Sequence, residues 1–439
     1  MSGVAIGFLF FVGMLGLIAL RVPIGVAMLL AGGAGFATLA GWLPLISQMK
    51  SNAYHLFSSY SLSVVPLFLL MGQFATKSGL SRGLFSAANA WLGHRPGGIA
   101  MAAIGGCGLF GAICGSSLAT AATMGQVALP ELKRYKYSGG LATASLAAGG
   151  TLGILIPPSI ILVIYAILTE QNIAKMFLAA FIPGVLAAGG YMLAIAVYVR
   201  FNPEAGPAGP EHSWREKITS LLEIGPALVI FTLVIGGIYS GFFTPTEAAA
   251  VGACGTGLIA LARGELNRRS LMDCLLGTAE AAAMIFLILL GAEVFNGFLA
   301  LTRMPAQLAE FMGTSGLPPY VILVGMLVLY LGLGCVMDSL SMILLTIPIF
   351  FPIIMALDFG LSPEELAIWF GILALIVVEV GLITPPVGMN VFIINAMAPD
   401  VPMWESFKGV TPFLISDGIR VVILIVFPSI TLWLVRVLS

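Results

Sequence analysis

The sequence predicts an all-α membrane protein built as an inverted repeat, with two re-entrant hairpins and two helices broken at Pro-Pro pairs. The 439-residue chain is 59% hydrophobic and only 9% charged, whereas soluble domains carry about 25% charged residues. Two apolar segments, 149–166 and 380–396, each contain consecutive prolines, at 157–158 and 385–386. Matched landmarks also recur in both halves of the chain.

The Pro-Pro pairs are expected to break helices inside the membrane. Proline lacks a backbone donor, and its ring clashes with the carbonyl one turn back. In lipid, the released carbonyls must be satisfied by protein or must line a cavity. A broken helix offers these carbonyls to a cation and a half-helix N-terminus to an anion. Two such breaks in corresponding halves therefore indicate a transport site.

The first elements follow from hydropathy and length. Two spans are predicted at about 3–20 and 22–40, and a third at 61–77. Residues 41–60 are expected to form an outer loop or a short interfacial helix, and 81–92 an amphipathic arm at the membrane surface. The first apolar run lacks a basic leader, so it is interpreted as a span with its N-terminus outside, not as a signal peptide.

Residues 97–130 are predicted to form a re-entrant hairpin. This segment is apolar, rich in Gly and Ser at its centre, and flanked by basic residues on both sides. A single span should not have two positive flanks, whereas a hairpin that enters and leaves on the cytoplasmic side obeys the positive-inside rule. Its tip is expected at Gly115-Ser116-Ser117, and the first broken helix, 139–168, follows.

The second half repeats this plan upside down, after a span at 176–199 and a polar loop at 200–217. The expected elements are spans at 218–240, 246–262 and 275–299, a hairpin at 317–352 with its tip near Met337-Asp338-Ser339, a broken helix at 365–397 and a last span at 412–438. The predicted divisions are 1–92 (scaffold and arm), 93–170 (transport elements), 171–217 (linking span and loop), 218–316 (second scaffold and arm), 317–398 (second transport elements) and 399–439 (C-terminal span).

Charge and repeat landmarks support this topology. Of the 19 Lys and Arg residues, 14 fall on the predicted inner side and both termini fall outside. Gly72 is expected to correspond to Gly291, Ser116 to Ser339, and Pro158 to Pro386. Because an odd number of spans links the copies, the second lies inverted, as in many secondary transporters.

Each hairpin tip and its facing break form a candidate sodium site, since sodium takes several hard oxygen ligands. The first site would use the hydroxyls of Ser116 and Ser117 with carbonyls of 153–158, and the second the carbonyls of 381–387 with Thr384. Asp338 is equally well interpreted as a ligand or as a helix cap. Candidate substrate contacts are Ser117, Ser159, Ser339 and Asn390.

Simpler interpretations compete with these assignments. Small residues at the tips also allow helices to approach closely. Glu379 lies in an apolar stretch, where carboxylates are usually functional or paired, and it is a candidate for contact with polar scaffold groups.

Other classes of function are disfavoured. No HExxH or Walker motif is present, which argues against an enzyme, including an intramembrane hydrolase, and against an ATP-driven pump. No filter sequence indicates a pore, and no basic patch indicates nucleic-acid binding. The five cysteines are expected to be buried free thiols.

The chain resembles the large membrane subunit of the tripartite ATP-independent periplasmic (TRAP) transporters along essentially its whole length. The similarity rests on FGAICGSSLATAATMGQVALPELKRYKY (110–137), AAGGTLGILIPPSIILVIYA (147–166), YSGFFTPTEAAAVGA (239–253) and VGLITPPVGMNVF (380–392). The resemblance implies sodium ligands at Ser116, Ser117, Gly153, Ile156 and Pro158 in one site, and at Gly334, Gly381, Thr384 and Val387 in the other. The Thr384 hydroxyl has no counterpart in the first repeat, where Ile156 stands.

The resemblance also implies an elevator mechanism in the bacterial inner membrane, with Na+ as the coupling ion. Its implied partners are a small four-helix membrane subunit on a separate chain and a periplasmic binding protein that delivers an organic acid, such as a C4-dicarboxylate or sialic acid. Two alternatives stay open: a standalone sodium/dicarboxylate symporter of similar architecture, and a scaffold or receptor without transport.

Overall fold

The computed structural model describes residues 3–314 and 316–438, and this part of the chain is entirely helical, without a strand. Two short 3-10 turns, Tyr60–Ser63 and Pro203–Ala205, accompany the α-helices. The helices are α1 (Gly3–Ala19), α2 (Ile24–Ala40), α3 (Trp42–Ser58), α4 (Val64–Lys77), α5 (Leu80–Leu92), α6 (Gly98–Cys114), α7 (Ser117–Arg134), α8 (Gly139–Leu155), α9 (Ile160–Leu168), α10 (Ile173–Phe201), α11 (Trp214–Glu223), α12 (Gly225–Tyr239), α13 (Pro245–Ala262), α14 (Arg268–Thr302), α15 (Met304–Thr314), α16 (Pro319–Gly334), α17 (Ser339–Met355), α18 (Pro363–Gly381), α19 (Met389–Met397), α20 (Met403–Val426) and α21 (Pro428–Leu438).

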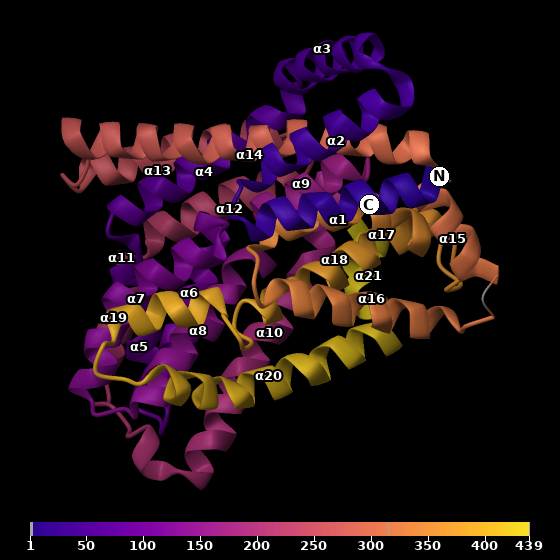
Figure 1. Ribbon diagram of the computed structural model, residues 1–439. Helices are drawn as coiled ribbons and strands as arrows, with labels where there is room; N and C mark the ends of the chain where they lie inside the picture. The colour runs from indigo at the N-terminus through magenta and orange to yellow at the C-terminus, as the bar shows by residue number, and fades with distance from the viewer. Residues whose placement is uncertain (1–2, 315, 439) are drawn as a thin grey trace.

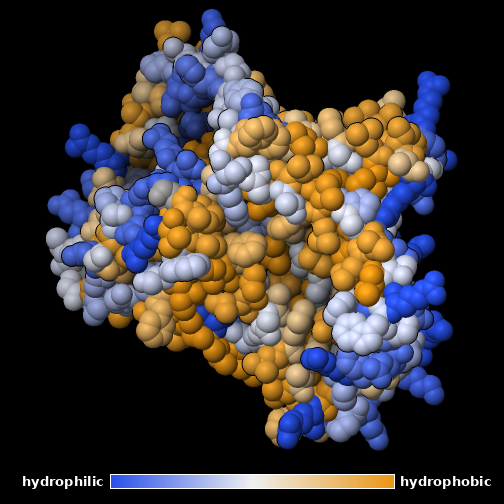
Figure 2. All heavy atoms as spheres, turned by 180° about the vertical axis from the view of Figure 1, so that it is seen from behind, coloured by the Kyte–Doolittle hydropathy of each residue, from blue (hydrophilic) through white to orange (hydrophobic). Residues whose placement is uncertain are grey.

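The helices have the lengths and compositions of a multi-pass membrane protein. Among the described residues, α10, α13, α14 and α20 are each long and apolar enough to cross a membrane. Three further pairs are bent spans or re-entrant segments: α3 with α4 (55°), α8 with α9 (44°) and α11 with α12 (51°). Figure 2 shows hydrophobic residues gathered in a broad band, with hydrophilic residues at two opposite margins.

The predicted hairpins and broken helices are confirmed. In the first hairpin α6 turns into α7 at residues 115–116, and in the second α16 is joined to α17 by residues 335–338. The breaks separate α8 from α9 and α18 from α19, and each Pro-Pro peptide bond is cis. The order span, arm, hairpin, broken helix, span therefore occurs twice, as α4–α10 and as α14–α20.

The helices pack in two sets. In the first set, α2 and α4 lie along α14, and α4 and α12 also contact α13. In the second set, α8 contacts α6, α7, α10, α19 and α20, while α16 and α17 contact α18. The arms α5 and α15 pack against the hairpin helices α6 and α17. Figure 1 shows α14, α2 and α4 on one side and α20 on the opposite side, with the first hairpin and α8 between them.

Some elements differ from the sequence-based expectation. The span predicted at 218–240 is divided at Ile224, and α11 begins earlier, at a capping box formed by Ser213 and Glu216. The last span, predicted at 412–438, begins instead at Met403 and is interrupted at Phe427, because the residue before a proline disfavours helical geometry.

Helix α3 and Cys254 are two further places where the structure can be set against the sequence-based predictions. The segment predicted to be an outer loop or an interfacial helix is the helix α3, which has only Leu45 buried and rests on α2 and α14. Of the five cysteines, all free, Cys254 is exposed on α13, so the expectation of burial is wrong at that position.

Close packing of α2 on α14 generates a testable prediction. A Cβ atom added to Gly32 would lie 2.7 Å from the Cα atom of Phe295. Gly32→Val should therefore force the two helices apart and destabilise the protein by about 1–3 kcal/mol, the usual range for overpacking. Thermal unfolding in detergent measures the loss.

Gly13→Val on α1 is the matched control, because no atom outside its own helix lies within 4 Å of the added Cβ. Equal melting temperatures for the two variants would contradict the predicted contact.

Candidate functional site

The tip of the first hairpin is pressed against the first break. Gly115 adopts a left-handed conformation (φ +66°), and Ser116 caps α7 with its side chain. A Cβ atom added to Gly153 would lie 2.5 Å from Thr120 Oγ1 and 2.7 Å from the carbonyl oxygen of Ser116. One added to Gly115 would lie 3.2 Å from the carbonyl oxygen of Pro158. Glycine at both positions lets oxygens of the tip and of the break converge.

Thr120 lies with Ser116 and Gly153 at this contact, although it is not among the site residues predicted from the sequence. Its side chain is fully buried beside the Cys114 thiol, and among the described residues Oγ1 has no hydrogen-bond partner of regular geometry. A buried hydroxyl left without a partner costs about 1–3 kcal/mol, so a ligand at this place would satisfy it. The available signal was spacing, because Thr120 lies four residues after Ser116, on the same face of the helix.

The residue types around Gly153 fit a sodium ion. The Ser116 carbonyl and the Thr120 hydroxyl are hard, uncharged oxygens, and both lie within 3 Å of the point where a Gly153 side chain would begin. Ile156 is also at this break, but its side chain packs toward Gly108 and Gly184. Only the backbone of Ile156 is thus available to a cation.

The second hairpin meets its break through the same kind of glycine contact. A Cβ atom added to Gly381 would lie 2.6 Å from Gly334 Cα, and one added to Gly111 in the first repeat would lie 2.4 Å from Gly153 Cα. The Gly388 N–H also donates to the Cys335 carbonyl at 3.3 Å. Gly334 and Gly381 are thus placed together as expected, whereas Gly111 was missed.

The remaining residues predicted for the second site are more exposed than those of the first site. Asp338 caps α17 by accepting the Ser341 N–H at 3.0 Å, so the structure gives it the role of a helix cap. The Thr384 hydroxyl donates to the Val380 carbonyl at 2.7 Å. Residues 385–387 are exposed, whereas the residues of the first break are buried except for the half-buried Ile156.

The helix caps correct the expected correspondence of the two tips. Ser116 and Asp338 are the N-cap residues of α7 and α17, and Ser117 and Ser339 are the first residues of those helices. Ser116 therefore corresponds to Asp338, not to Ser339. The expected pairing is wrong because the second connection is two residues longer than the first.

Three candidate substrate residues lie in the interior between the repeats. The Ser339 hydroxyl donates to Glu379 Oε1 at 2.6 Å, and the Ser117 side chain is a neighbour of the same carboxylate. Asn390 donates from Nδ2 to the Ala147 carbonyl at 3.2 Å. A Cβ atom added to Gly150 would lie 3.0 Å from Asn390 Nδ2 and 3.2 Å from the Ser117 carbonyl oxygen, so these two residues are adjacent.

The fourth candidate substrate residue, Ser159, is fully buried, and its side chain caps α9. Glu379 contacts the hairpin serines and also interacts electrostatically with Arg420 and Asp417 of α20.

A buried ionic network behind the first break was not predicted. Asp417 accepts from Arg420 at 2.7 Å and from the Tyr191 hydroxyl at 2.9 Å. That hydroxyl lies 3.1 Å from Thr151 Oγ1 on α8. The signal in the sequence was an aspartate and an arginine three residues apart in an apolar segment, a spacing that places them together on one helix face.

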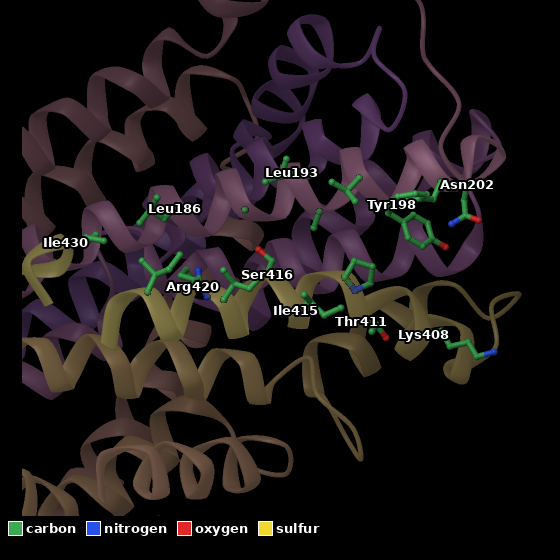
Figure 3. A pocket seen from close by; sticks show the side chains of 17 residues that line it. Leu186, Leu193, Tyr198, Asn202, Lys408, Thr411, Ile415, Ser416, Arg420 and Ile430 are labelled. Atoms are coloured by element: carbon green, nitrogen blue, oxygen red, sulfur yellow. The ribbon is translucent and has the colours of Figure 1, made fainter. Parts of the chain in front are cut away.

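The same arginine borders a groove of about 760 Å³ between α10 and α20. Figure 3 shows Lys408 and Asn202 at one end of the groove and Ile430 near the other. Because most of its lining is apolar, this groove lacks the converging oxygens found at the hairpin tips.

The fold and this site define an all-α membrane protein of the inverted-repeat class found among secondary transporters. Among solved structures of similar fold is the YdaH transporter of Alcanivorax borkumensis, with a TM-score of 0.61 at 15% identity, covering 90% of this chain and 89% of that one. The sequence profile described as "Tripartite ATP-independent periplasmic transporter, DctM component" matches residues 11–430. The chain belongs to this family.

Named relatives agree with the assignment. The chain is 36% identical to the C4-dicarboxylate TRAP transporter large permease protein DctM of Pseudomonas aeruginosa, covering 88% of this chain and 89% of the relative. It is 32% identical to the sialic acid TRAP transporter large permease protein SiaM of Vibrio cholerae, covering 96% of each. It is 30% identical to the ectoine TRAP transporter large permease protein TeaC of Halomonas elongata, covering 96% and 97%.

The buried ion pair generates a second prediction. Arg420→Met leaves the Asp417 carboxylate buried without its cationic partner, and removing one member of such a pair typically costs about 3–5 kcal/mol. The double variant Asp417→Leu with Arg420→Met should recover much of this loss, because neither charge remains. Thermal unfolding of both variants in detergent tests the pair. A double variant that is less stable than Arg420→Met would contradict it.

Proposed function

We propose that this chain imports an organic acid into the cell, driven by an inward sodium gradient, as the large membrane subunit of a three-part transporter. The observation that carries the proposal is the twice-repeated contact between a hairpin tip and a Pro-Pro-broken helix. In each repeat, a pair of glycines brings the two backbones together, at Gly111 with Gly153 and at Gly334 with Gly381. Broken membrane helices commonly hold coupling ions in secondary transporters.

Sodium at the first tip would be held by the Ser116 and Ser117 groups, Gly153, Ile156 and Pro158, to which we add Thr120. Sodium at the second tip would be held by the backbone of Gly334, Gly381 and Val387 with the side chains of Thr384 and Asp338. Each ion would fix a hairpin to its break. The unpartnered Thr120 hydroxyl supports the first site, because a cation there would satisfy a buried oxygen.

The substrate would bind between the two tips. Ser117 and Asn390 are adjacent there, and Asn390 Oδ1 has no hydrogen-bond partner in the described part of the chain. Ser339 and Ser159 are buried hydroxyls from the second tip and the first break. Relatives are named for the transport of C4-dicarboxylate, sialic acid, ectoine and isethionate, which supports an organic acid as the substrate class.

An elevator motion would carry this site across the membrane. The hairpins and broken helices pack with α10 and α20, while α2, α4, α13 and α14 form the other packed set. We assign the hairpins and broken helices, with α10 and α20, as the moving part, and the set that contains α14 as the scaffold in the bacterial inner membrane, with both chain ends in the periplasm. The partners would be a small four-helix membrane subunit and a periplasmic binding protein.

Reconstitution tests this proposal. Proteoliposomes that contain the chain and a small subunit should take up labelled organic acid only with an inward sodium gradient and a cognate binding protein. A potassium gradient of equal size is the control. Sodium-driven uptake without any binding protein would instead establish the standalone symporter, and uptake independent of sodium would overturn the coupling.

Substitutions at the tips test the sites. Ser116→Leu or Thr384→Leu should reduce sodium-dependent uptake to background, because a bulky apolar side chain fills the space beside the break. Membrane insertion should be retained. Thr219→Leu, at an exposed position on α11, is the matched control and should transport normally. Uptake by the tip variants at the control rate would contradict the assignment of these sites.

A further inference from the structure

We propose that Glu379 is a positioning residue that couples the two sodium sites, by holding both hairpin tips on one buried carboxylate. This inference rests on the proposed function, because it presupposes a sodium site at each tip. It assigns a role to a charged group that is not itself counted among the sodium or substrate ligands.

The Glu379 carboxylate lies between the two hairpin tips. Glu379 lies in the last turn of α18, two residues before Gly381 of the second break, and its side chain is completely buried. Ser339 donates to Oε1 at 2.6 Å, and the Ser117 side chain is a second neighbour of the carboxylate. Oε2 has no hydrogen-bond partner within residues 3–314 and 316–438. The carboxylate thus sits between the tips with one acceptor oxygen still free.

The two serines beside Glu379 are equivalent residues of the two repeats. Ser117 and Ser339 are the first residues of α7 and α17, directly after the capping residues Ser116 and Asp338. A cation that orders the cap region of one tip also orders the following serine. Glu379 is then held in the orientation that the other tip requires.

The two repeats carry different residues at the position of Glu379. Thr151 and Glu379 occupy corresponding positions, each seven residues before the second proline of its break. The Thr151 hydroxyl lies against the Tyr191 hydroxyl of α10, whereas Glu379 reaches the hairpins. The inverted repeat therefore does not require a carboxylate here, and Glu379 is a feature particular to the second copy.

A carboxylate suits this role because both of its oxygens accept hydrogen bonds. A glutamine keeps one acceptor oxygen, which can retain the bond from Ser339, but it replaces the second acceptor oxygen with a donating amide and removes the negative charge. Coupling between sites is reciprocal and typically changes affinity by about 5- to 150-fold. Loss of this coupling should weaken sodium binding and make the two sites bind independently, while the ligands of each site stay in place.

The test is an equilibrium titration of labelled-sodium binding to the purified full chain, with choline chloride holding the ionic strength constant. In the unmodified protein the binding should be cooperative, with a Hill coefficient near 2. Glu379→Gln should lower that coefficient to about 1 and raise the half-saturating sodium concentration by about 5-fold or more. Glu293→Gln on α14 is the control and should titrate like the unmodified protein.

Ser339→Ala provides a second route if Glu379→Gln does not fold. It removes the donor while leaving the carboxylate, and it should also lower the Hill coefficient. Combining it with Glu379→Gln should add little further change, since both variants break the same connection.

The outcomes separate the two proposals. No sodium binding in the unmodified protein would overturn the sodium sites and the coupling together. Sodium binding whose Hill coefficient is 1 in the unmodified protein, or is unchanged by both variants, would overturn the coupling alone. Complete loss of binding in a folded Glu379→Gln protein would also overturn it, because Glu379 would then act as a ligand.

Discussion

The satisfaction of backbone polar groups within lipid is the constraint on which this structure depends. Each Pro-Pro pair frees carbonyl groups in the middle of an apolar segment, and lipid offers them no partner. In this structure a hairpin tip packs against each break, so that the non-helical backbone of the break contacts the non-helical backbone of the tip. Because both breaks must be covered in this way, the hairpins, the glycines at the contacts and the packing of α8 and α18 at the centre follow from the same requirement.

The two repeats solve this problem with different chemistry. The first break is almost entirely enclosed, and its tip contributes neutral oxygens, among them the Thr120 hydroxyl. At the second break, residues 385–387 are exposed and Asp338 replaces Ser116 as the helix cap. A shared backbone design thus gives two contacts between a hairpin tip and a break that differ in solvent access and in nearby charge.

Buried charge is concentrated around these breaks. Asp417 and Arg420 pair with each other behind the first break, while Glu379 lies between the hairpin tips. Desolvating such groups is expensive unless they are paired or hydrogen-bonded. These charged groups therefore lie among the hairpins, the broken helices and α20, whereas the contacts of α2 with α14 are made mainly by small and apolar residues.

The sequence by itself determined the membrane class, the inverted repeat, both hairpins and both breaks. These features depend on local signals: apolar length, paired prolines, clustered glycines and the distribution of positive charge. Gly153 and Gly381 were identified from the same local signals, whereas Gly334 was implied only by the family resemblance. Only the tertiary structure decided the contacts between segments far apart in the chain. Ser339 meets Glu379 across 40 residues, and Tyr191 meets Asp417 across 226. It also showed that Ser116 corresponds to Asp338, because the length of a turn is set by how the helices pack and not by the periodicity of either one.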